Sequence, residues 1–341
     1  MFLKRKKSSI IVNYFFRNIH KKQCFLFFLF FYVIFFIFSY GANENNGKLK
    51  QYVYNYLYAI ERIYQEDIFV KQDLYNIFKR KIEELFTKKN YAFDEIDEVF
   101  KNTLYFYSND SYLKIYKKDI FNQQYFNDKV EVSLEDKINI ILIKKNDFLI
   151  YYIKIYYFPV GYYKYFRDYL FSYYKEEHKD LKKIVIIDLI DNTGGSLYTA
   201  SFFINLFYPP KSYLFTIHYK NKSINYYSGE DYKDYFKDAI VFVVQNDMTA
   251  SSSEVVSGVL KRKGIVLGDF SYGKPFIQVN LDVNNFTVLY TNSFLNFNTT
   301  LEPHEKVKPD IFLSYRELNK EFILNLVFSF CYYLFFQIGG N

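Results

Sequence analysis

The sequence predicts an α/β protein with a helical N-terminal layer and an apolar segment before it. Short β-branched runs such as Val241–Val244 are typical of buried strands, and they alternate with amphipathic helical stretches after about residue 138. Between Tyr52 and Tyr107, apolar residues recur every three or four positions, as in helices. Cys24–Phe38 is an unbroken apolar run of 15 residues.

The apolar run near the N-terminus predicts export. Seven Lys and Arg residues precede it, and the first acidic residue of the chain is Glu44. At about 1.5 Å per residue the run spans roughly 22 Å, short of a ~30 Å hydrocarbon core. We therefore expect residues 1–42 to be a signal peptide or a membrane anchor that leaves the rest of the chain periplasmic or otherwise extracytoplasmic. Ser39–Gly41 offers small residues for cleavage, and both alternatives stay open.

The charges and the metal-ligating residue types narrow the function classes. The chain has 44 basic and 37 acidic residues, and the seven basic residues before Cys24 account for the excess. The remainder is balanced, so we predict no nucleic-acid partner. Two cysteines far apart do not indicate a structural disulfide. None of the four histidines has the spacing of a metal pair, so we predict neither a metal nor another cofactor.

Residues 43–129 are predicted to form the helical region. After Asp73, a candidate helix cap, apolar residues again recur three or four positions apart, which predicts a further helix. Residues 130–315 are predicted to form the core, with strands at 138–143 and 148–155 joined as a hairpin, a helix at 162–174, a strand at 183–189 and a helix at 196–207. Two further hairpins are expected at 213–227 and 276–290. Residues 316–341 hold an apolar helix, 322–336, which is either core or a second membrane contact.

The stretch from Val241 to Gln278 carries the candidate chemistry. Ser251 lies at a strand-to-helix corner, where unpaired backbone N–H groups can stabilise an oxyanion. A serine nucleophile needs a base, and lysine can serve where burial disfavours its charged form. Lys274 lies among aromatic residues that suit this role. A structural interpretation is also open, because serines before helices are often caps and turn lysines are often solvated.

Taken together, these residues resemble the S41 family of serine peptidases, the C-terminal processing or tail-specific proteases. The family's T-A-S-x-S-E box matches Thr249–Glu254, and its T-F-G-K-G turn loosely matches Ser271–Pro275. Its D-L-R-x-N-x-G-G turn matches Asp188–Gly195, with Ile190 in place of the arginine. The resemblance extends over roughly 148–311 and implies a ClpP/crotonase-like ββα-spiral core.

The resemblance also implies roles for individual residues. Ser251 would be the nucleophile, Lys274 the base and Gln278 the residue that holds the lysine amine. Four residues of extended strand cover roughly 13 Å, so that contact requires a bend around Gly273. Backbone amides near Gly194, Gly195 and Ser252 would form the oxyanion hole. His304 and His218 are alternative bases for Ser251.

The function implied by the resemblance is an exported serine endopeptidase that acts on proteins or peptides through a Ser–Lys dyad. Many S41 peptidases carry a peptide-binding PDZ domain after the helical region. Here only about 30 residues separate Leu113 from the turn at Lys144–Asp147, which is too few for such a domain. The chain is therefore expected to be a PDZ-less member, in which an adaptor or oligomer could select substrates. The turn Asn109–Leu113 resembles a family turn that precedes the second domain. A non-catalytic binding module on the same fold and a membrane-tethered scaffold remain alternatives.

Overall fold

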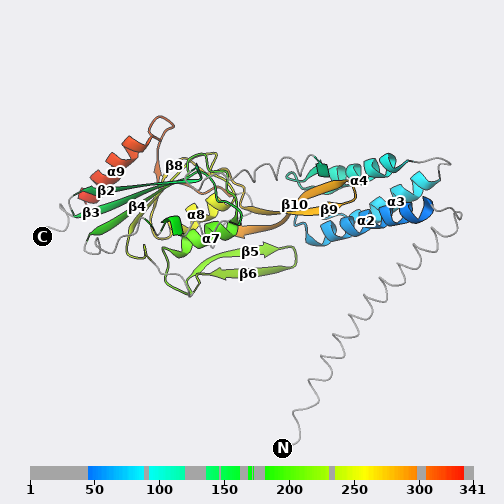
Figure 1. Ribbon diagram of the computed structural model, residues 1–341, viewed down its shortest axis with the longest axis horizontal. Coiled ribbons are helices and arrows are strands. Elements are labelled where there is room, and N and C mark those ends of the chain that lie inside the picture. The colour runs from blue at the N-terminus through cyan, green and yellow to red at the C-terminus, as the bar shows by residue number, and fades with distance from the viewer. Residues whose placement is uncertain are drawn as a thin grey trace, which may run out of the picture.

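The computed structural model describes residues 45–87, 92–119, 136–145, 147–161, 168–170, 172, 181–229, 235–297 and 305–333. These form an elongated molecule, with a mixed α/β body at one end and helices at the other (Figure 1). The predicted signal or anchor, residues 1–42, lies outside the described residues. Among the helices that are described, none is both long enough and apolar enough to cross a membrane.

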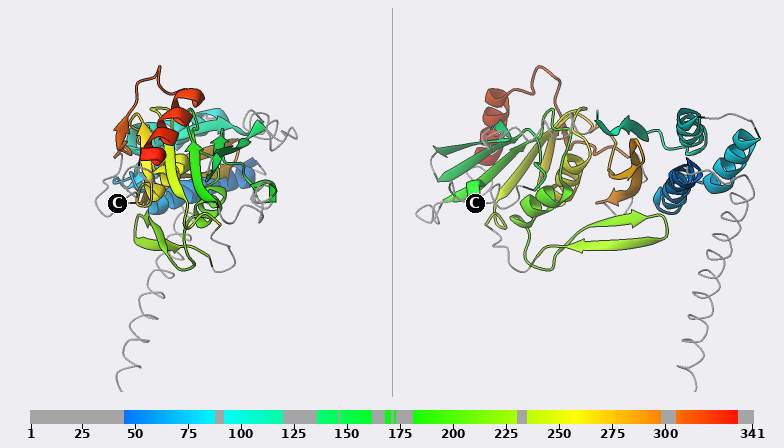
Figure 2. Two further views of the ribbon diagram at one scale, coloured as in Figure 1. Left: turned by 90° about the vertical axis from the view of Figure 1, so that its left-hand side faces the viewer. Right: turned by 45° about the vertical axis from the view of Figure 1, so that its right-hand side comes forward.

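The predicted helical layer contains three helices in the described part of residues 43–129: α2 (Asn45–Glu66), α3 (Leu74–Phe86) and α4 (Phe93–Tyr107). Their buried apolar stripes pack on one another and on the hairpin of β9 (Phe276–Val283) and β10 (Phe286–Asn296). This hairpin runs from the α/β body into the helical end (Figures 1 and 2). The layer is therefore joined to the body by shared core residues.

The N-terminus of α3 has the predicted cap, because the Asp73 carboxylate accepts a hydrogen bond from the Asn76 N–H at 3.1 Å. Asp73→Ala should lower the free energy of unfolding by about 1 kcal/mol, since that N–H loses its partner. Urea denaturation of the full chain measures this change. Asp73→Asn keeps an acceptor oxygen and should retain most of the stability, so equal losses in both variants would contradict the capping role.

The larger sheet has six strands in the order β11-β8-β7-β4-β3-β2. Only the β2–β3 pair is antiparallel; the other neighbours run parallel. The sheet consists of β2 (Ile138–Lys145), β3 (Phe148–Ile155), β4 (Lys182–Asp188), β7 (Ile240–Gln245), β8 (Ile265–Gly268) and β11 (Ile311–Phe312). The predicted hairpin at 138–155 and the predicted strands at 183–189 and 241–244 agree with this sheet.

Helices cover both faces of this sheet. On one face, α7 (Leu197–Asn205) and α8 (Ser252–Lys261) pack on alternate residues of β3, β4 and β7. The intervening residues face α9 (Lys320–Tyr332), whose Ile323, Val327 and Cys331 are buried against them. The predicted C-terminal helix is thus a core element along its described length. Most of the predicted helix 162–174 lies outside the described residues.

The smaller sheet has five strands. Its path is β1-β10-β5-β6, and β9 pairs with the other edge of β10. Besides the β9–β10 hairpin it contains β1 (Lys114–Lys117), β5 (Tyr213–Tyr219) and β6 (Lys222–Tyr227). Both predicted hairpins are present, but β10 continues six residues beyond the predicted end at Tyr290 and carries an irregularity between Thr291 and Ser293.

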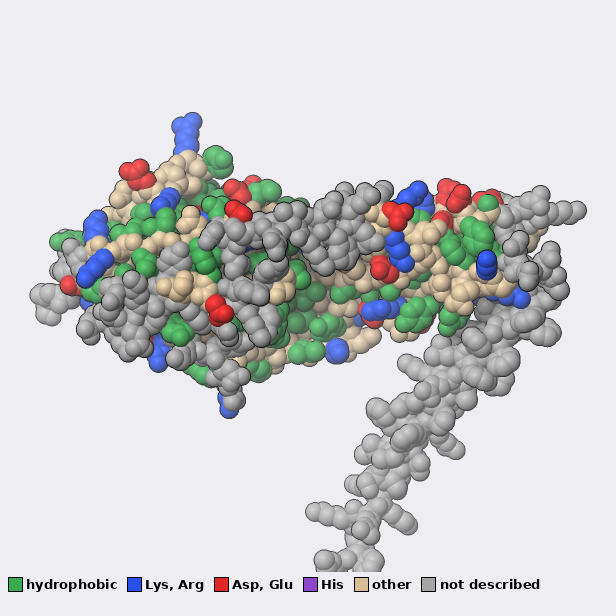
Figure 3. Space-filling view, viewed as in Figure 1, with side chains coloured by type: hydrophobic (Ala, Val, Ile, Leu, Met, Phe, Trp, Pro, Cys, Tyr) green, Lys and Arg blue, Asp and Glu red, His purple; other side chains and the backbone are tan. Residues whose placement is uncertain are grey.

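Surface side chains are mixed in character. On the face shown in Figure 3, acidic and basic side chains are interspersed over both ends, and hydrophobic side chains gather between the two ends. The exposed aromatic residues of the body include Tyr157, Tyr198 and Tyr272, which follow or flank the turns at the carboxyl ends of the central strands. Exposed aromatic side chains thus surround the turns at this edge of the sheet.

Candidate active site

The site forms where two neighbouring parallel strands end. Asp188 of β4 is in register with Val244 of β7, so the turns that follow these strands lie side by side. Asn192 joins them: its carbonyl accepts a hydrogen bond from the Ala250 N–H at 3.0 Å, and its side-chain oxygen accepts from Gly194 N–H (2.9 Å) and from Ser253 Oγ (2.6 Å). Since Asn192 is buried, these bonds fix the glycine turn against the nucleophile turn.

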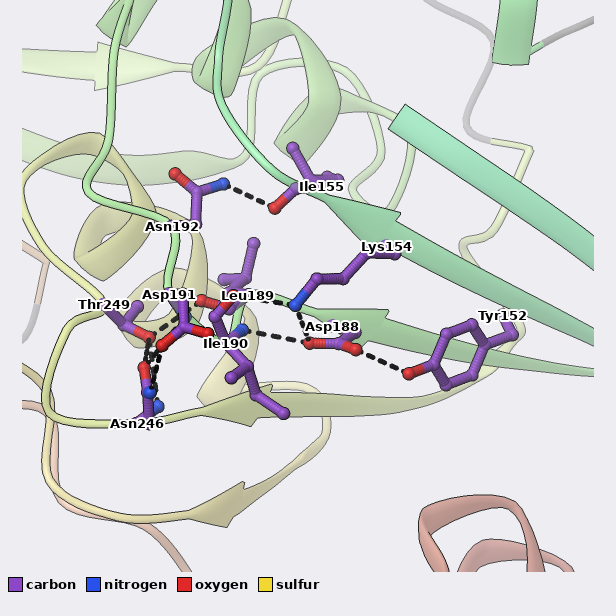
Figure 4. Close-up of polar contacts among 10 residues, drawn as sticks. All are labelled: Tyr152, Lys154, Ile155, Asp188, Leu189, Ile190, Asp191, Asn192, Asn246 and Thr249. Atoms are coloured by element: carbon purple, nitrogen blue, oxygen red, sulfur yellow. Dashed lines mark hydrogen bonds and ion pairs between the residues drawn. The ribbon is translucent and has the colours of Figure 1, made fainter. Parts of the chain in front are cut away.

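A buried polar cluster lies beneath the glycine turn (Figure 4). The Asp188 carboxylate accepts hydrogen bonds from Tyr152 Oη at 2.5 Å and from Lys154 Nζ at 2.8 Å, and Lys154 also donates to the Ile190 carbonyl at 2.7 Å. Burial, reinforced by the Asp188 charge, raises the pKa of Tyr152, so this phenol stays a donor. Ile190 carries no charge, so it cannot pair with Asp188. The cation beside Asp188 is Lys154 of β3.

Ser251 lies at the N-terminus of α8 in an unusual backbone conformation. Its φ of 59° is in the left-handed region, which non-glycine residues adopt at a cost of about 1–3 kcal/mol. The Ser251 N–H donates to Glu254 Oε2 at 2.9 Å, a bond that holds the strained residue in place. A Cβ on Gly194 would lie 2.9 Å from the Ser251 Cβ, so only glycine leaves room beside the serine.

Lys274 reaches the same region from the loop before β9. Its Nζ donates to Gln278 Oε1 at 3.0 Å, so the predicted contact is present, and the chain bends at Gly273, whose φ is 90°. The lysine is half-buried, and burial, with a smaller contribution from Lys114, lowers the pKa of its amine. No hydrogen bond joins Lys274 to Ser251 within the described residues. The structure therefore provides an amine poised toward its neutral form, held by a glutamine.

Glu254 links the nucleophile turn to the lysine loop. Its buried carboxylate accepts four hydrogen bonds: from Ser251 N–H and Lys274 N–H at one oxygen, and from Ser271 Oγ and Gly273 N–H at the other, all between 2.6 and 2.9 Å. Burial raises the pKa of Glu254, and these four donors act against that rise. The carboxylate thus sets the distance between the two candidate catalytic segments.

Glu254→Gln should destabilise the fold even though it preserves the side-chain shape. The amide NH₂ would face donors where an oxygen now accepts, leaving buried N–H groups unpaired at about 1–3 kcal/mol each. We expect a loss of about 3 kcal/mol in the free energy of unfolding, measured by urea denaturation. The same change at exposed Glu98 of the helical layer is the control, and a loss no larger than that control would contradict this role.

The predicted oxyanion residues are not equivalent. The Gly194 N–H already donates to Asn192, whereas the N–H groups of Gly195 and Ser252 make no hydrogen bond to any described residue. Gly195 has a φ of 123°, and a Cβ there would lie 2.1 Å from the Phe158 carbonyl oxygen. Ser252 is the first residue of α8, where main-chain donors have no partner in the helix. Gly195 and Ser252 are therefore the amides available to an anion.

The alternative bases receive no support from the described residues. His218 lies on β5, where its Nδ1 pairs with Ser223 Oγ at 2.8 Å and its ring stacks on Phe294. His304 lies outside the described residues. The described part of the chain also contains no group of three or more His, Cys, Asp or Glu side chains arranged to hold a metal ion.

Sequence reasoning missed three residues of this site. Glu254 was matched within the family box but assigned no role, although a serine followed three residues later by glutamate is a helix-start signal. Lys154 gave no signal beyond its place at a strand end. Tyr112, whose carbonyl accepts a hydrogen bond from Gln278 Nε2 at 3.0 Å, lies 166 positions away from its partner. Such a contact cannot be derived from local sequence.

Comparison with known families agrees with this arrangement. Residues 150–313, which include both turns and the lysine loop, match the model of peptidase family S41. This part of the chain is similar to peptidase family S41, and we call it the S41 region. The S41 region begins in β3 and ends just after β11, so it excludes the helical layer and α9.

Curated relatives resemble the S41 region at low identity. A probable CtpA-like serine protease of Staphylococcus aureus (strain COL) is 28% identical over 149 residues, which is 42% of this chain and 30% of the relative. That of Staphylococcus haemolyticus is 26% identical over 114 residues, or 33% of this chain and 23% of the relative. The aligned segment thus spans less than a third of the length of either staphylococcal relative.

A solved structure extends the likeness to more of the fold. A lipoprotein from Streptococcus agalactiae superposes with a TM-score of 0.57 at 14% identity, covering 81% of this chain and 94% of that chain. At this identity the likeness concerns the fold alone. The superposition extends beyond residues 150–313, since it covers 81% of this chain.

Proposed function

We propose that this chain is an exported serine endopeptidase that cleaves proteins or peptides through a Ser251–Lys274 dyad. One observation carries the proposal: the half-buried Lys274 amine, with its lowered pKa, is held by Gln278, and the backbone N–H groups of Lys274 and Ser251 donate to the same oxygen of Glu254. The match of residues 150–313 to the model of peptidase family S41 supports peptidase chemistry. The roles of the individual residues are our inference.

In the first half-reaction, Ser251 Oγ attacks the peptide carbonyl carbon and neutral Lys274 takes the hydroxyl proton. The carbonyl oxygen becomes an oxyanion, which the N–H groups of Gly195 and Ser252 would stabilise by about 3–4 kcal/mol per donor. When the C–N bond breaks, Lys274 returns the proton to the leaving amine. Water then attacks the acyl carbon while Lys274 takes one of its protons; the bond from Ser251 Oγ to that carbon breaks, Lys274 gives the proton to Oγ, and the carboxylic acid product leaves.

The hydrogen bond from Lys274 to Gln278 describes the resting arrangement in this mechanism. To act as the base, the amine must turn toward Ser251 once a substrate is bound. Catalytic hydrogen bonds are often long or absent before substrate binds and tighten in the complex. In this mechanism Gln278 holds the resting amine and releases it when substrate binds.

The experiment that tests the proposal is cleavage of an unfolded protein by the purified full-length chain. Casein should be cut at internal bonds in a pH series from 7 to 10, and faster as the pH rises, because the lowered pKa of Lys274 lets this amine lose its proton at a lower pH than an ordinary lysine. Peptide products identified by mass spectrometry would show endopeptidase action. If casein stays intact across this pH range while circular dichroism shows that the chain is folded, the enzyme interpretation is refuted.

Substrate selection without a PDZ domain requires another element, and we infer an adaptor or an oligomer on the ββα-spiral core. The described residues between α4 and β2 form only the turn before β1 and β1 itself, and residues 120–135 lie outside the described part. Light scattering of the active chain with and without casein would separate self-association from a requirement for a second protein.

Export remains our proposal from residues 1–42. A signal peptide would be removed after the small residues near Ser39–Gly41, whereas an anchor would be retained. N-terminal sequencing of the protein recovered from its native membrane fraction and from the soluble extracytoplasmic fraction distinguishes the two. Recovery of the uncleaved chain from the cytoplasm alone would contradict both.

A non-catalytic binding module is the second candidate, and one observation favours it. Within the described residues, Ser251 and Lys274 share no hydrogen bond, although each is bonded to Glu254 through its backbone. The same fold could hold a peptide without cutting it. Binding of casein fragments that survives in Ser251→Ala, together with no cleavage by the unmodified chain, would favour this candidate.

A further inference from the structure

The turn between α4 and β1 reaches the candidate active site from the helical layer. The carbonyl of Tyr112 accepts a hydrogen bond from Gln278 Nε2 at 3.0 Å, and the ring of Tyr112 lies under the Lys274 amine, 4.9 Å from Nζ to the ring centroid. Because Gln278 Oε1 accepts from Lys274 Nζ at 3.0 Å, the turn contacts the lysine both directly and through the glutamine. Two independent contacts thus join this turn to one amine.

Asp110 fixes the turn to the strand opposite Gln278. Its buried carboxylate accepts hydrogen bonds from the N–H groups of Tyr112 (2.8 Å) and Thr291 (2.9 Å), and from Thr291 Oγ1 at 3.2 Å. Thr291 is the cross-strand partner of Gln278, and its carbonyl accepts from the Ile68 N–H at 3.1 Å. The helical layer therefore holds both sides of the main chain at Thr291, where β10 becomes irregular.

The surroundings of the amine explain what the Tyr112 ring does. The ring packs on Phe276, with centroids 5.2 Å apart, and so keeps water from one side of the lysine. The charged groups that face Lys274 are Lys114 of β1, which disfavours protonation, and Asp110 and Glu254, which favour it. A cation over a ring is also weakly stabilised. Burial is the largest of the influences on the Lys274 pKa, and the Tyr112 ring lies against the buried amine.

We propose that the Asp110–Tyr112 turn is a positioning element of the active site, through which the helical layer holds Gln278 and shields the Lys274 amine. The inference rests on the proposed function, in which Lys274 acts as the base. Neither residue takes part in bond making or proton transfer: Asp110 acts through Thr291 and the turn, and Tyr112 acts on Gln278 and on the surroundings of the Lys274 amine. The helical layer is then part of the catalytic unit although it lies outside the S41 region.

Lysine labelling tests this inference without depending on proteolysis. The full chain is treated with trinitrobenzenesulfonate over a pH series, and modification of Lys274 is followed by peptide mass spectrometry. The reagent attacks neutral amines, so the pH midpoint of the rate reports the pKa of Lys274, whereas the plateau reports access. Tyr112→Ala should move the midpoint upward by about one pH unit toward the ordinary 10.5. Tyr112→Phe keeps the ring and should have the same midpoint as the unmodified chain. The backbone carbonyl that binds Gln278 is present in both variants.

Cleavage assays give a second readout. At pH 8, Tyr112→Ala should lower kcat about tenfold, because a tenfold smaller fraction of Lys274 is neutral, while KM changes less than twofold. Asp110→Asn should also lower kcat, by loosening the turn that holds Gln278; loss of the Asp110 charge alone would favour the neutral amine and act against this effect. The control is Asp73→Ala, which weakens the same helical layer at a residue that does not contact the turn and should leave both the midpoint and kcat unchanged.

The outcomes separate the two proposals. A labelling midpoint in Tyr112→Ala equal to that of the unmodified chain overturns the positioning role, whatever the protease activity. A shifted midpoint with no cleavage by the unmodified chain supports the positioning of Lys274 and refutes the proposed function. If Tyr112→Ala does not fold, Tyr112→Leu, which keeps an apolar side chain but no ring, is measured in its place and decided by the same midpoint.

Discussion

Ser251→Ala is expected to abolish casein cleavage while leaving the fold intact. Without the hydroxyl no acyl-enzyme can form, and loss of a serine nucleophile typically lowers kcat by ~10⁴-fold or more. Stability should not fall, since the Ser251 side chain makes no hydrogen bond to a described residue, and the backbone bond to Glu254 remains in the variant. The measurement is the rate of peptide release, with thermal unfolding of both proteins recorded alongside.

The neighbouring serines provide a matched control. Ser252 Oγ donates to the Gly195 carbonyl at 3.0 Å, so Ser252→Ala removes a hydroxyl only one residue away. This variant should lose far less activity than Ser251→Ala, because the Ser252 role proposed here belongs to its backbone N–H. Cleavage by Ser251→Ala at the rate of the unmodified chain would exclude Ser251 as the nucleophile, and a larger loss in Ser252→Ala would reassign it.

Lys274 is expected to control the pH dependence of activity. The mechanism requires the neutral amine, and burial lowers its pKa below the ordinary 10.5. Below that lowered pKa the amine is protonated, so kcat/KM should fall about tenfold per pH unit on the acid side and level off above it. A pH series of kcat/KM for casein peptides, at constant ionic strength, measures this limb.

Two substitutions at this position test the assignment. Lys274→Ala removes the base, and Lys274→Arg keeps a cation that cannot lose its proton in this range, so both should reduce kcat by ~10³-fold or more. Gln278→Ala should retain part of the activity, because it loosens the amine without removing it. Substantial activity in Lys274→Arg would mean that another group is the base, and His304 would then be examined by the same substitution series.

The strands and the candidate catalytic segments could be predicted because they depend on local patterns. Val241–Val244 is β-branched and fully apolar, so its place in the centre of a parallel sheet follows from composition. The order of the Gly194–Gly195 turn, the Ser251 box and the Lys274 loop is visible in the sequence, and parallel pairing of β4 with β7 brings the first two together.

The remaining features depend on contacts between distant segments. The Gly194 N–H was expected to join an oxyanion hole, but Asn192, two residues earlier, already accepts its hydrogen bond. The length of β10 was underestimated because the strand changes partners, from β1 to β5, near Thr291. Tyr112 completes the lysine site from another layer. Sequence spacing contains no information on such pairings when hydrogen-bond partners are more than 100 positions apart.

The β9–β10 hairpin determines whether the helical layer and the α/β body can be separated. Its outer part, including Leu281, Val288 and Tyr290, is buried in the helical layer, while Leu295 belongs to the core of the α/β body. One ribbon is therefore common to two interiors. Removing the helices would uncover an aromatic and aliphatic surface on the body, so the peptidase-like portion is not a detachable module, and both ends are expected to melt in a single cooperative transition.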